Sequence, residues 1–453
     1  MATRRTLIKG SIALPLLPFG LSSCSGGGPN PYLQANFGPV DIESTVTDLK
    51  VTGTIPAELN GRFLRNGPNP AMDEDGGGYH WFTGRGMVHG LRLSDGRAMW
   101  YKNRYVGGAA PNTNVIGHAG KTIAIVESGG LPQNMGYDLE STGDNAAIGG
   151  GFTAHPKLDP DTGELHAICY DWANLRDHVR YVVIDEDGEL AEETEVALSG
   201  MPMIHDMSLT KNYAVIYDLP VTLSFLALAG GAGFPFRWDN EHEARVGLLP
   251  RNGSASDIIW SSVTPNYSYH PMNAYEDAAG RVVIDICRYE KMFDQDTQGP
   301  FGDSSPRLDR WTIDPTTQAV NEQTIDARGQ EFPRCHPDLN GKPYRYGYTV
   351  AVEDGAFPAI YKHDLKTGSA TEFKVGAGRH SAEPVFVPKE GAQAEDEGYL
   401  LTYVFDESSN TSDLIILDAQ DLTRPALAQI HIPARVPYGF HGNWVPDTVT
   451  SPV

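Results

Sequence analysis

The sequence predicts an all-β fold and, among all-β architectures, favours a β-propeller over a sandwich or barrel. Short runs rich in Val, Ile, Tyr and Phe recur along the chain and end at Asp-Gly, Asn-Gly, Thr-Gly or Pro, as the strands of antiparallel hairpins do. The 49 glycines and 32 prolines favour many turns over long helices. Similar strand-turn-strand phrases, such as LDPDTGELH, IDEDGEL and HDLKTGSATEF, repeat weakly, which is typical of propellers.

The expected strands follow one another through most of the chain. They lie within residues 61–67, 87–96, 122–130, 181–190, 213–220, 281–290, 344–355, 399–408 and 413–422. Neither a long amphipathic helix nor a compositional break interrupts them. We therefore expect residues 37–453 to form a single β-propeller domain.

One apolar segment, residues 219–238, departs from this pattern. It has a Gly-rich middle and is broken by Pro220 and Pro235. We expect a loop or short helix that lines an apolar pocket or covers the propeller. A patch that dips into a lipid surface is the alternative.

The N-terminal segment, residues 1–24, is predicted to be a targeting signal that is not part of the fold. An Arg pair precedes an apolar run that is too short to span a bilayer as a helix, a pattern that resembles a twin-arginine export signal. The segment ends in LSSC, which resembles a bacterial lipoprotein cleavage site. Cys24 would then carry a lipid and residues 25–36 would form a flexible tether. An ordinary signal peptide that includes Cys24 is the alternative, and both interpretations predict a periplasmic or membrane-anchored bacterial protein.

The charge balance excludes one class of partner. The chain has 58 acidic and 35 basic residues, a net charge of −23 and a pI near 4.9. Such a surface disfavours nucleic acid, and it would also be repelled by anionic lipid. Membrane contact would therefore depend on a lipidated Cys24 or on the apolar segment 219–238. The sequence leaves the oligomeric state open.

Four histidines stand in similarly built contexts that place each at a strand end beside a loop. They are His155 in TAHPK, His205 in MIHDMSLT, His270 in YHPMNAYE and His441 in YGFHGNW. The first two intervals, 50 and 65 residues, are close to one blade of about 40–50 residues, whereas the last, 171 residues, would skip blades. Blades aim side chains at a common axis, and imidazole nitrogens suit iron, copper, zinc and nickel. We therefore expect a shared metal site.

Three glutamates are candidates for supporting that site: Glu127 in IVESGGLP, Glu331 in EFP and Glu383 in SAEPVFVP. A metal-bound imidazole usually donates its other N–H to an acceptor, which fixes the orientation of the ring. A buried carboxylate in turn needs a partner. An imidazole N–H beside a cation would be a good one.

In these strings and their order, the chain resembles the carotenoid cleavage oxygenase family, which includes apocarotenoid and lignostilbene dioxygenases. The resemblance also covers LNGRFLRNGPNP, YHWFTGRGMVHG, NTNVIGHAGK, GKPYRYGYT and VPYGFHGNW, and so nearly everything after the tether. It implies a seven-bladed β-propeller with a helix and loop cap over the face that bears the metal site. It also implies Fe(II) held by the four histidines, with the three glutamates behind three of them.

The resemblance further implies an oxidoreductase that incorporates both atoms of O2 across a conjugated C=C bond and releases two carbonyl products. Four neutral ligands leave the iron its full charge, and glutamates one bond further out keep it ferrous. The sequence has no GxGxxG fingerprint after a strand that would indicate nicotinamide or flavin. A non-catalytic pigment-binding lipoprotein and an isomerase on the same iron remain as alternatives.

One motif departs from the family pattern. Where the family often has FDGDGM, this chain has FTGRGM, so that Thr83 and Arg85 replace two acidic residues. We expect an altered local salt bridge and an intact metal site. His80 and His89 flank this turn and are expected to be structural hydrogen-bonding residues.

The substrate is predicted to be a carotenoid or apocarotenoid, with a lignostilbene-type phenylpropanoid alkene as the alternative. Lignostilbene enzymes tend to pair a tyrosine with a lysine directly before the first glutamate, where this chain has Val126. Tyr105 could still supply a hydroxyl, but a phenolate would lack its charge-assisted partner. The expected lining of the substrate tunnel, each member of which could instead be blade packing, is Tyr105, Val126, Phe152, Tyr269, Phe332 and Phe440.

Overall fold

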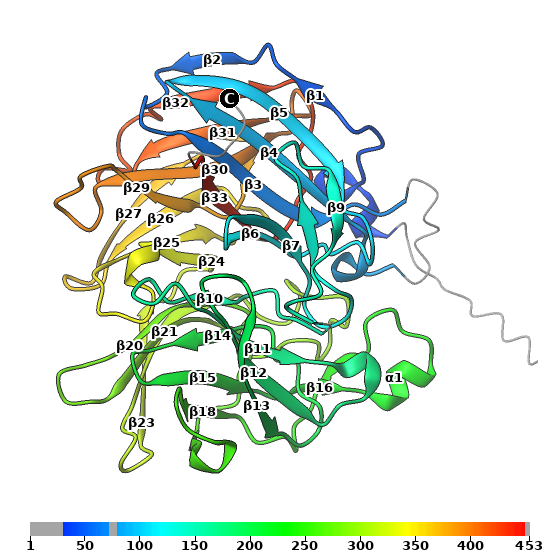
Figure 1. The fold of residues 1–453 in the computed structure, drawn as a ribbon, viewed down its shortest axis with the longest axis vertical. Coiled ribbons are helices and arrows are strands. Elements are labelled where there is room, and N and C mark those ends of the chain that lie inside the picture. Colours follow the sequence, from blue (N-terminus) through cyan, green and yellow to red (C-terminus); the bar gives the residue numbers. More distant parts are fainter. Residues whose placement is uncertain (1–29, 72–78, 150, 449–453) are drawn as a thin grey trace, which may run out of the picture.

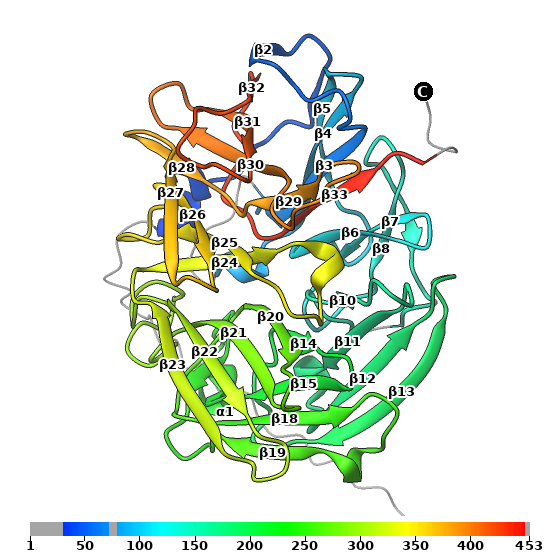
Figure 2. The same cartoon turned by 90° about the vertical axis from the view of Figure 1, so that its left-hand side faces the viewer.

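The fold is a seven-bladed β-propeller, as the sequence resemblance implied (Figures 1 and 2). The computed structural model describes residues 30–71, 79–149 and 151–448. Seven sheets of four to six strands are arranged in a ring, and a separate two-stranded sheet lies beside them. Among the described residues, no helix is long and apolar enough to cross a membrane.

Five blades are each built from a single stretch of the chain. Blade 2 contains β6 (Asn114–His118), β7 (Lys121–Ile125), β8 (Gln133–Met135) and β9 (Ser141–Asp144). Blade 3 contains β10 (Lys157–Leu158), β11 (Leu165–Tyr170), β12 (His178–Ile184) and β13 (Leu190–Ala197). Blade 4 contains β14 (Met207–Leu209), β15 (Tyr213–Asp218), β18 (Arg245–Pro250) and β19 (Ile259–Ser262). Blade 5 contains β20 (Pro271–Glu276), β21 (Val282–Arg288), β22 (Arg307–Ile313) and β23 (Val320–Asp326). Blade 6 contains β24 (Gln330–Cys335), β25 (Tyr346–Ala351), β26 (Ala359–Asp364) and β27 (Ser369–Lys374).

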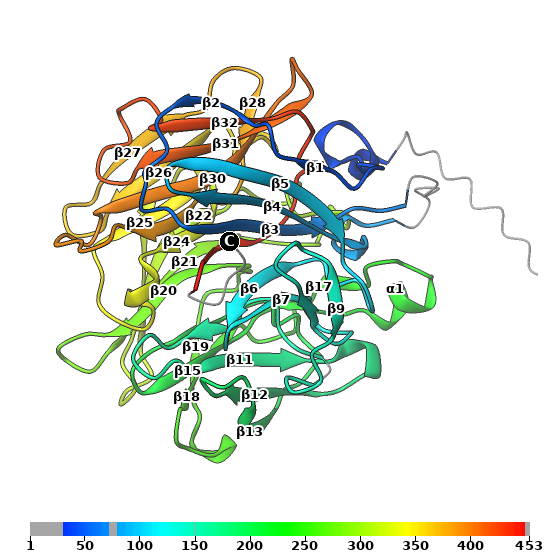
Figure 3. The same ribbon diagram turned by 45° about the horizontal axis from the view of Figure 1, so that its top comes forward.

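The other two blades combine strands from both ends of the chain. Blade 1 contains β1 (Thr45–Val46), β3 (Gly61–Pro68), β4 (Gly86–Ser94), β5 (Arg97–Tyr105) and β33 (Gly442–Pro446). Blade 7 contains β2 (Lys50–Gly53), β28 (Arg379–Ser381), β29 (Val385–Pro388), β30 (Gly398–Asp406), β31 (Thr411–Asp418) and β32 (Ala428–Ile432). β33 pairs with β3 and β2 pairs with β32, both antiparallel (Figures 2 and 3). These two pairings close the ring without leaving the last blade open.

The middle and outer strands differ in burial because of their place in the blade. In blade 3, every residue of β11 is buried, whereas β13 is mostly exposed. A middle strand is covered by neighbouring blades on both faces, so it can be apolar throughout. The exposed outer strand contains three glutamates in Leu190–Ala197, and charge on an edge strand discourages pairing with another sheet.

Helices are few and short, so the predicted cap is made mainly of loops. The only α-helix in the described part of the chain is α1 (Phe225–Ala229). It lies in the loop between β16 (Val221–Leu223) and β17 (Phe236–Trp238), which form the separate two-stranded sheet. The 3-10 helices are η1 (Pro31–Leu33), η2 (Ala35–Phe37), η3 (Trp81–Thr83), η4 (Trp172–Asn174), η5 (Ala255–Asp257) and η6 (Pro337–Leu339).

The second half of the expected tether is folded, contrary to the prediction for residues 25–36. Tyr32 and Asn36 are buried, and the Tyr32 ring stacks on Trp81 with centroids 6.0 Å apart. An aromatic residue in this segment buries apolar area against the propeller, which a Gly-rich tether could not do. The predicted export signal and Cys24 lie outside the described residues.

Candidate metal centre and substrate cavity

The four predicted histidines occupy equivalent places in four blades. His155 and His205 lie two residues before β10 and β14, and His270 and His441 lie directly before β20 and β33. Each of these strands is the terminal strand of its sheet on the side of the propeller axis (Figure 1). The loop that enters the blade therefore delivers the imidazole to the axis.

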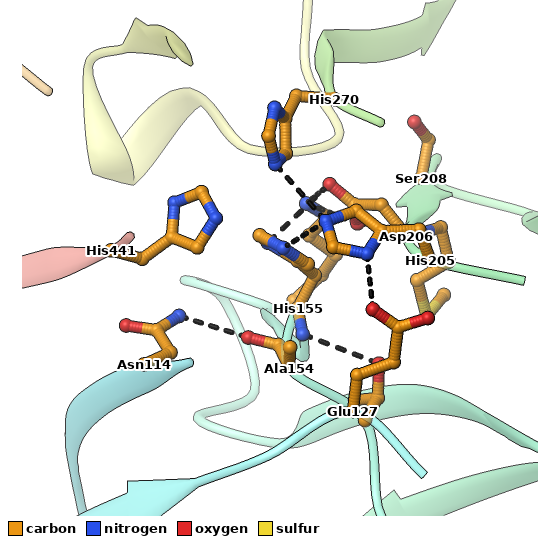
Figure 4. Close-up of polar contacts among 12 residues, drawn as sticks. Asn114, Glu127, Ala154, His155, His205, Asp206, Ser208, His270 and His441 are labelled. Carbon is orange, nitrogen blue, oxygen red and sulfur yellow. Dashed lines mark hydrogen bonds and ion pairs between the residues drawn. The ribbon is translucent and has the colours of Figure 1, made fainter. Parts of the chain in front are cut away.

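The four imidazoles converge on one point (Figure 4). One ring nitrogen of each lies within 4.8 Å of the corresponding nitrogen of the others. Nε2 of His205 is 3.1 Å from Nε2 of His155 and 3.2 Å from Nε2 of His270. The His441 ring centroid is 4.3 Å from that of His155 and 4.7 Å from that of His270.

Burial favours the metal-binding form of three of these rings. All four side chains are buried. Burial, followed by the neighbouring imidazoles, lowers the pKa of His155 and His270 well below the ordinary value. Burial also lowers the pKa of His441, although Glu383 opposes the shift. Neutral imidazole is the metal-ligating state.

The three predicted glutamates lie behind three of the histidines. Nδ1–H of His270 donates to Oε2 of Glu331 at 2.6 Å, and Nδ1–H of His441 donates to Oε1 of Glu383 at 2.9 Å. Nδ1–H of His205 donates to Oε2 of Glu127. Each bond fixes the tautomer and leaves Nε2 facing the axis.

The seven blades divide these seven residues among themselves. Blades 1, 3, 4 and 5 supply the histidines, and blades 2, 6 and 7 supply the glutamates. Glu127 follows β7, Glu331 lies in β24 and Glu383 lies between β28 and β29. The long interval between His270 and His441 is thus explained, because blades 6 and 7 lie within it and contribute carboxylates.

Further residues of the site were not predicted from the sequence. The Tyr170 hydroxyl donates to Oε1 of Glu127. Arg334 donates to both carboxylate oxygens of Glu383, at 2.9 and 3.0 Å. Burial raises the pKa of Glu383, but Arg334 and His441 outweigh it and bring the pKa to about 2. Arg334 is near Glu331 in sequence and pairs with Glu383 in space, so sequence proximity would have misled.

Two other unpredicted residues do have a sequence signal. Asp206 directly follows the ligand His205, and Lys157 lies two residues after His155. The Asp206 carboxylate faces Nδ1 of His155 at 3.6 Å (Figure 4), and Lys157 pairs with it at 2.8 Å. Their positions within the histidine strings TAHPK and MIHDMSLT were the available clue.

This donor set fits a divalent transition metal. Four imidazole nitrogens meet at the axis, and the carboxylates contact the outer nitrogens. Such a set suits iron, copper, zinc or nickel and is unlike the all-oxygen sites of calcium or magnesium.

A cavity of about 660 Å³ reaches this centre. Its lining includes His205, His270 and His441, together with four residues that were predicted to line the tunnel: Val126, Tyr269, Phe332 and Phe440. Aromatic side chains from the loops and from the β16–β17 connection complete the wall, namely Trp81, Phe82, Trp172, Phe234 and Phe301. The cavity is therefore suited to an apolar, elongated or ring-bearing ligand.

Tyr105 and Phe152, also predicted for the tunnel, do not line it. Phe152 is 1% exposed and packs in an apolar cluster between blades 2 and 3. The Tyr105 hydroxyl accepts a hydrogen bond from the Asn69 amide at 2.7 Å, and the Arg85 guanidinium lies 4.6 Å from the centre of its ring. Phe152 is thus used for packing between blades, and Tyr105 for local polar contacts outside the cavity.

The departure from the family motif also has a different outcome from the one expected. Instead of forming an altered salt bridge, Arg85 stacks on Tyr105, and within the described ranges no carboxylate lies within ion-pair distance of it. Thr83 and Arg85 both line the cavity. The predicted structural roles of His80 and His89 are confirmed, because both are buried and hydrogen-bonded, to the Gln298 carbonyl and the Tyr101 hydroxyl respectively.

Comparison with known proteins identifies the family. The family model described as retinal pigment epithelial membrane protein matches residues 37–446. A carotenoid cleavage oxygenase of Mycobacterium tuberculosis is 41% identical, with 92% of this chain and 98% of that protein covered. The apocarotenoid-15,15'-oxygenase of Synechocystis is 30% identical, with 87% and 92% covered. The crystal structure of a Pseudomonas brassicacearum lignostilbene dioxygenase superposes with a TM-score of 0.85 at 27% identity, covering 92% of this chain and 99% of that one. This chain belongs to the carotenoid cleavage oxygenase family of enzymes.

Proposed function

We propose that this protein is a non-haem Fe(II) dioxygenase that cleaves a conjugated C=C bond of a carotenoid or apocarotenoid into two carbonyl products. The observation that carries the proposal is the opening of an aromatic-lined cavity directly onto the four-histidine centre. When bound, ferrous iron would supply the redox chemistry for adding both atoms of O2 across the double bond. The four histidines would hold it, because neutral nitrogen donors suit iron.

The protein's own residues would position the alkene and exclude water. Phe332 stacks near His270, with ring centroids 5.4 Å apart, and Phe440 packs on Trp81 at 4.6 Å. These rings border the cavity beside the histidines. A flat conjugated chain would be held by such faces with little polar competition.

The wall of the cavity favours an apolar polyene over a phenolic stilbene. Val126 lies directly before Glu127 and lines the cavity, and an isopropyl group cannot pair with a phenolate. Tyr105, the candidate hydroxyl donor, lies outside the lining. The fold similarity to a lignostilbene dioxygenase nevertheless makes cleavage of a phenylpropanoid alkene the second candidate.

The test combines metal analysis with an oxygen-uptake assay on anaerobically purified protein. β-Apocarotenals, intact carotenoids and hydroxystilbenes are compared as substrates. We expect about one iron per chain, and O2 consumption that matches aldehyde formation from the first two classes. Preference for hydroxystilbenes would support the second candidate. Retained pigment without turnover would indicate a binding protein, and product without O2 uptake would indicate an isomerase.

A matched variant sharpens the choice of substrate. Val126→Lys places an ammonium at the cavity wall beside Glu127. If the cavity selects polyenes by being apolar, this change should lower activity on carotenoid substrates and raise the relative activity on hydroxystilbenes. Unchanged selectivity would remove Val126 from the argument.

We also propose export by a twin-arginine signal and attachment to a membrane, either through Cys24 or through α1. The support for the second route is that Phe225, Leu226 and Leu228 are 57%, 86% and 39% exposed, in the same β16–β17 connection that contributes Phe234 to the cavity. Cell fractionation of Cys24→Ser, and flotation of Leu226→Ser with neutral vesicles, test the two routes separately. Unaltered membrane association in both variants would contradict the proposal.

A further inference from the structure

One of the four histidines differs from the others in its support. Four blades supply histidines and three supply glutamates, so no blade remains to supply a glutamate for His155. The carboxylate that faces its outer nitrogen comes instead from Asp206, with Oδ2 at 3.6 Å from Nδ1 (Figure 4). A carboxylate therefore lies near each of the four outer nitrogens, and Asp206, at 3.6 Å, is at ion-pair distance and not at hydrogen-bond distance.

Asp206 is fixed where it stands. Its residue exposure is 4%, and the backbone N–H of Met207 donates to Oδ1 at 2.6 Å. Lys157 Nζ lies 2.8 Å from Oδ1 and 3.1 Å from Oδ2. A buried carboxylate without partners would be strongly destabilising, and these contacts leave Oδ2 directed between Lys157 and His155.

The ion pair also connects two ligand-bearing loops. Lys157 follows His155 and begins β10, whereas Asp206 follows His205 and precedes β14. The spacing of His155 and His205 is therefore fixed twice. It is fixed at the metal centre by the two imidazoles, and beside that centre by the ion pair between Lys157 and Asp206. Oδ2 of Asp206 lies 3.1 Å from Lys157 Nζ and 3.6 Å from Nδ1 of His155, so the same oxygen faces both residues.

We propose that Asp206, held by Lys157, is the positioning residue for His155 and acts as the glutamates do for the other three histidines. The proposal rests on the metal centre of the proposed function and not on the identity of the substrate. Because Lys157 shares the carboxylate, Asp206 is a weaker acceptor than an unshared glutamate. We therefore expect its loss to weaken metal binding less than the loss of Glu331 does.

The test measures metal binding directly. Full-length protein is stripped with a chelator and titrated with Co(II), whose visible absorption reports ligand geometry. Loss of an outer hydrogen-bond partner typically costs about 10–100-fold in metal affinity. We expect Asp206→Asn to lose about 10-fold with a shifted Co(II) spectrum, and the matched control Glu331→Gln to lose more.

Lys157→Met separates the positioning role from a structural one. This variant removes the cation but leaves Asp206 its hydrogen bond from the Met207 N–H, which should keep the carboxylate facing His155. Co(II) affinity should then stay within a few-fold of wild type while the melting temperature of the metal-free protein falls. A purely structural pair predicts that both variants lose melting temperature and that neither alters the Co(II) spectrum. Wild-type Co(II) affinity and spectrum in Asp206→Asn, with a clear loss in Glu331→Gln, would overturn the proposal.

Asp206→Glu provides a second test of the proposal. If Asp206→Asn does not fold, Asp206→Glu, which keeps a carboxylate, should retain Co(II) binding within a few-fold, and a loss as large as that of Glu331→Gln would overturn the proposal. Normal Co(II) binding in the wild type without cleavage of any alkene would contradict the proposed function alone.

Discussion

Two groups of buried histidines in this molecule differ in what their outer nitrogen faces. At the axis, Nδ1 of His270 and of His441 donates to a carboxylate at 2.6 and 2.9 Å. In the blades, Nδ1 of His89 and of His166 meets a tyrosine hydroxyl at 2.9 and 2.8 Å. All four rings are buried, so the acceptor is what distinguishes these two ligand histidines from these two packing histidines.

The acceptor matters because it decides what charge the ring can tolerate on its other side. A carboxylate behind the ring orients it and makes its other nitrogen a better ligand for a metal ion than a neutral hydroxyl would. At His166 the second ring nitrogen, Nε2, is already occupied by another side chain of the protein. Arg251 donates to Nε2 of His166 at 3.0 Å and to Asp159 at 2.6 Å. A metal ion could be held by the ligand atoms of Asp159, Glu164 and His166, which are close enough together. In this protein, however, these residues bind the guanidinium of Arg251.

The largest expected effect comes from removing one histidine of each group. His270→Ala should abolish iron retention and oxygen-dependent cleavage together, because only three imidazoles remain at the axis and Glu331 loses the imidazole that it orients. His166→Ala should keep both, while leaving Arg251 and Tyr181 short of a partner at a cost of about 1–3 kcal/mol. Metal analysis, oxygen uptake and urea unfolding check the pair. A His270→Ala protein that still holds stoichiometric iron would remove the distinction.

The metal centre was more predictable from the sequence than the cavity was. Ligand chemistry restricts a position to histidine, and the loop before an inner strand repeats from blade to blade, so His155, His205, His270 and His441 could be selected as a set. The number of blades could be predicted only from the family resemblance. The repeat is obscured in the sequence by β16, β17 and the strands that close the ring.

The cavity wall could be predicted only in part, because apolar residues serve packing and binding equally well. Phe440 and Phe152 both lie close in sequence to a ligand histidine, yet only Phe440 lines the cavity. Asp206 was missed for another reason: its place beside His205 was a clue to the site but not to its partner. Its partner Lys157 lies in a different blade, and pairing between blades leaves no pattern in a single sequence.

A second pair of variants applies the same contrast to the aromatics. Phe152→Ala should destabilise the fold by about 3–5 kcal/mol, since it empties a fully buried site, and should leave the KM of the folded fraction near wild type. Phe440→Ala opens onto the cavity, so it should cost less stability and raise KM for a polyene substrate. Urea unfolding and steady-state kinetics together test this. Equal losses of stability with no change in KM would place Phe440 with the packing residues.

The blade histidines should also make the fold acid-sensitive. Burial, followed by Arg251, lowers the pKa of His166 to about 4, from about 6.5 in an unfolded chain. The unfolded state therefore takes up the proton first, so the stability that depends on neutral His166 is present above pH 6.5 and is lost as the pH falls toward 4. The shift corresponds to roughly 3 kcal/mol. Urea unfolding from pH 7 to pH 4 should be less steeply pH-dependent in His166→Gln, which keeps an acceptor for Arg251 but does not titrate. An equal slope in both proteins would contradict the assignment.

The smallest effect is expected at Arg85, which belongs to neither the metal centre nor the packed core. Its side chain is exposed, and its contact is the face of Tyr105, an interaction worth about 0.5–1 kcal/mol at exposed sites. Arg85→Gln should therefore leave iron content unchanged and reduce stability by no more than about 1 kcal/mol. Arg85 also borders the cavity. A change in KM for polar-ended apocarotenoids, with none for hydrocarbon carotenoids, would show that Arg85 contacts the polar end of the substrate. Loss of iron in this variant would mean that the turn supports the axis, and the separation between metal centre and cavity rim would no longer hold.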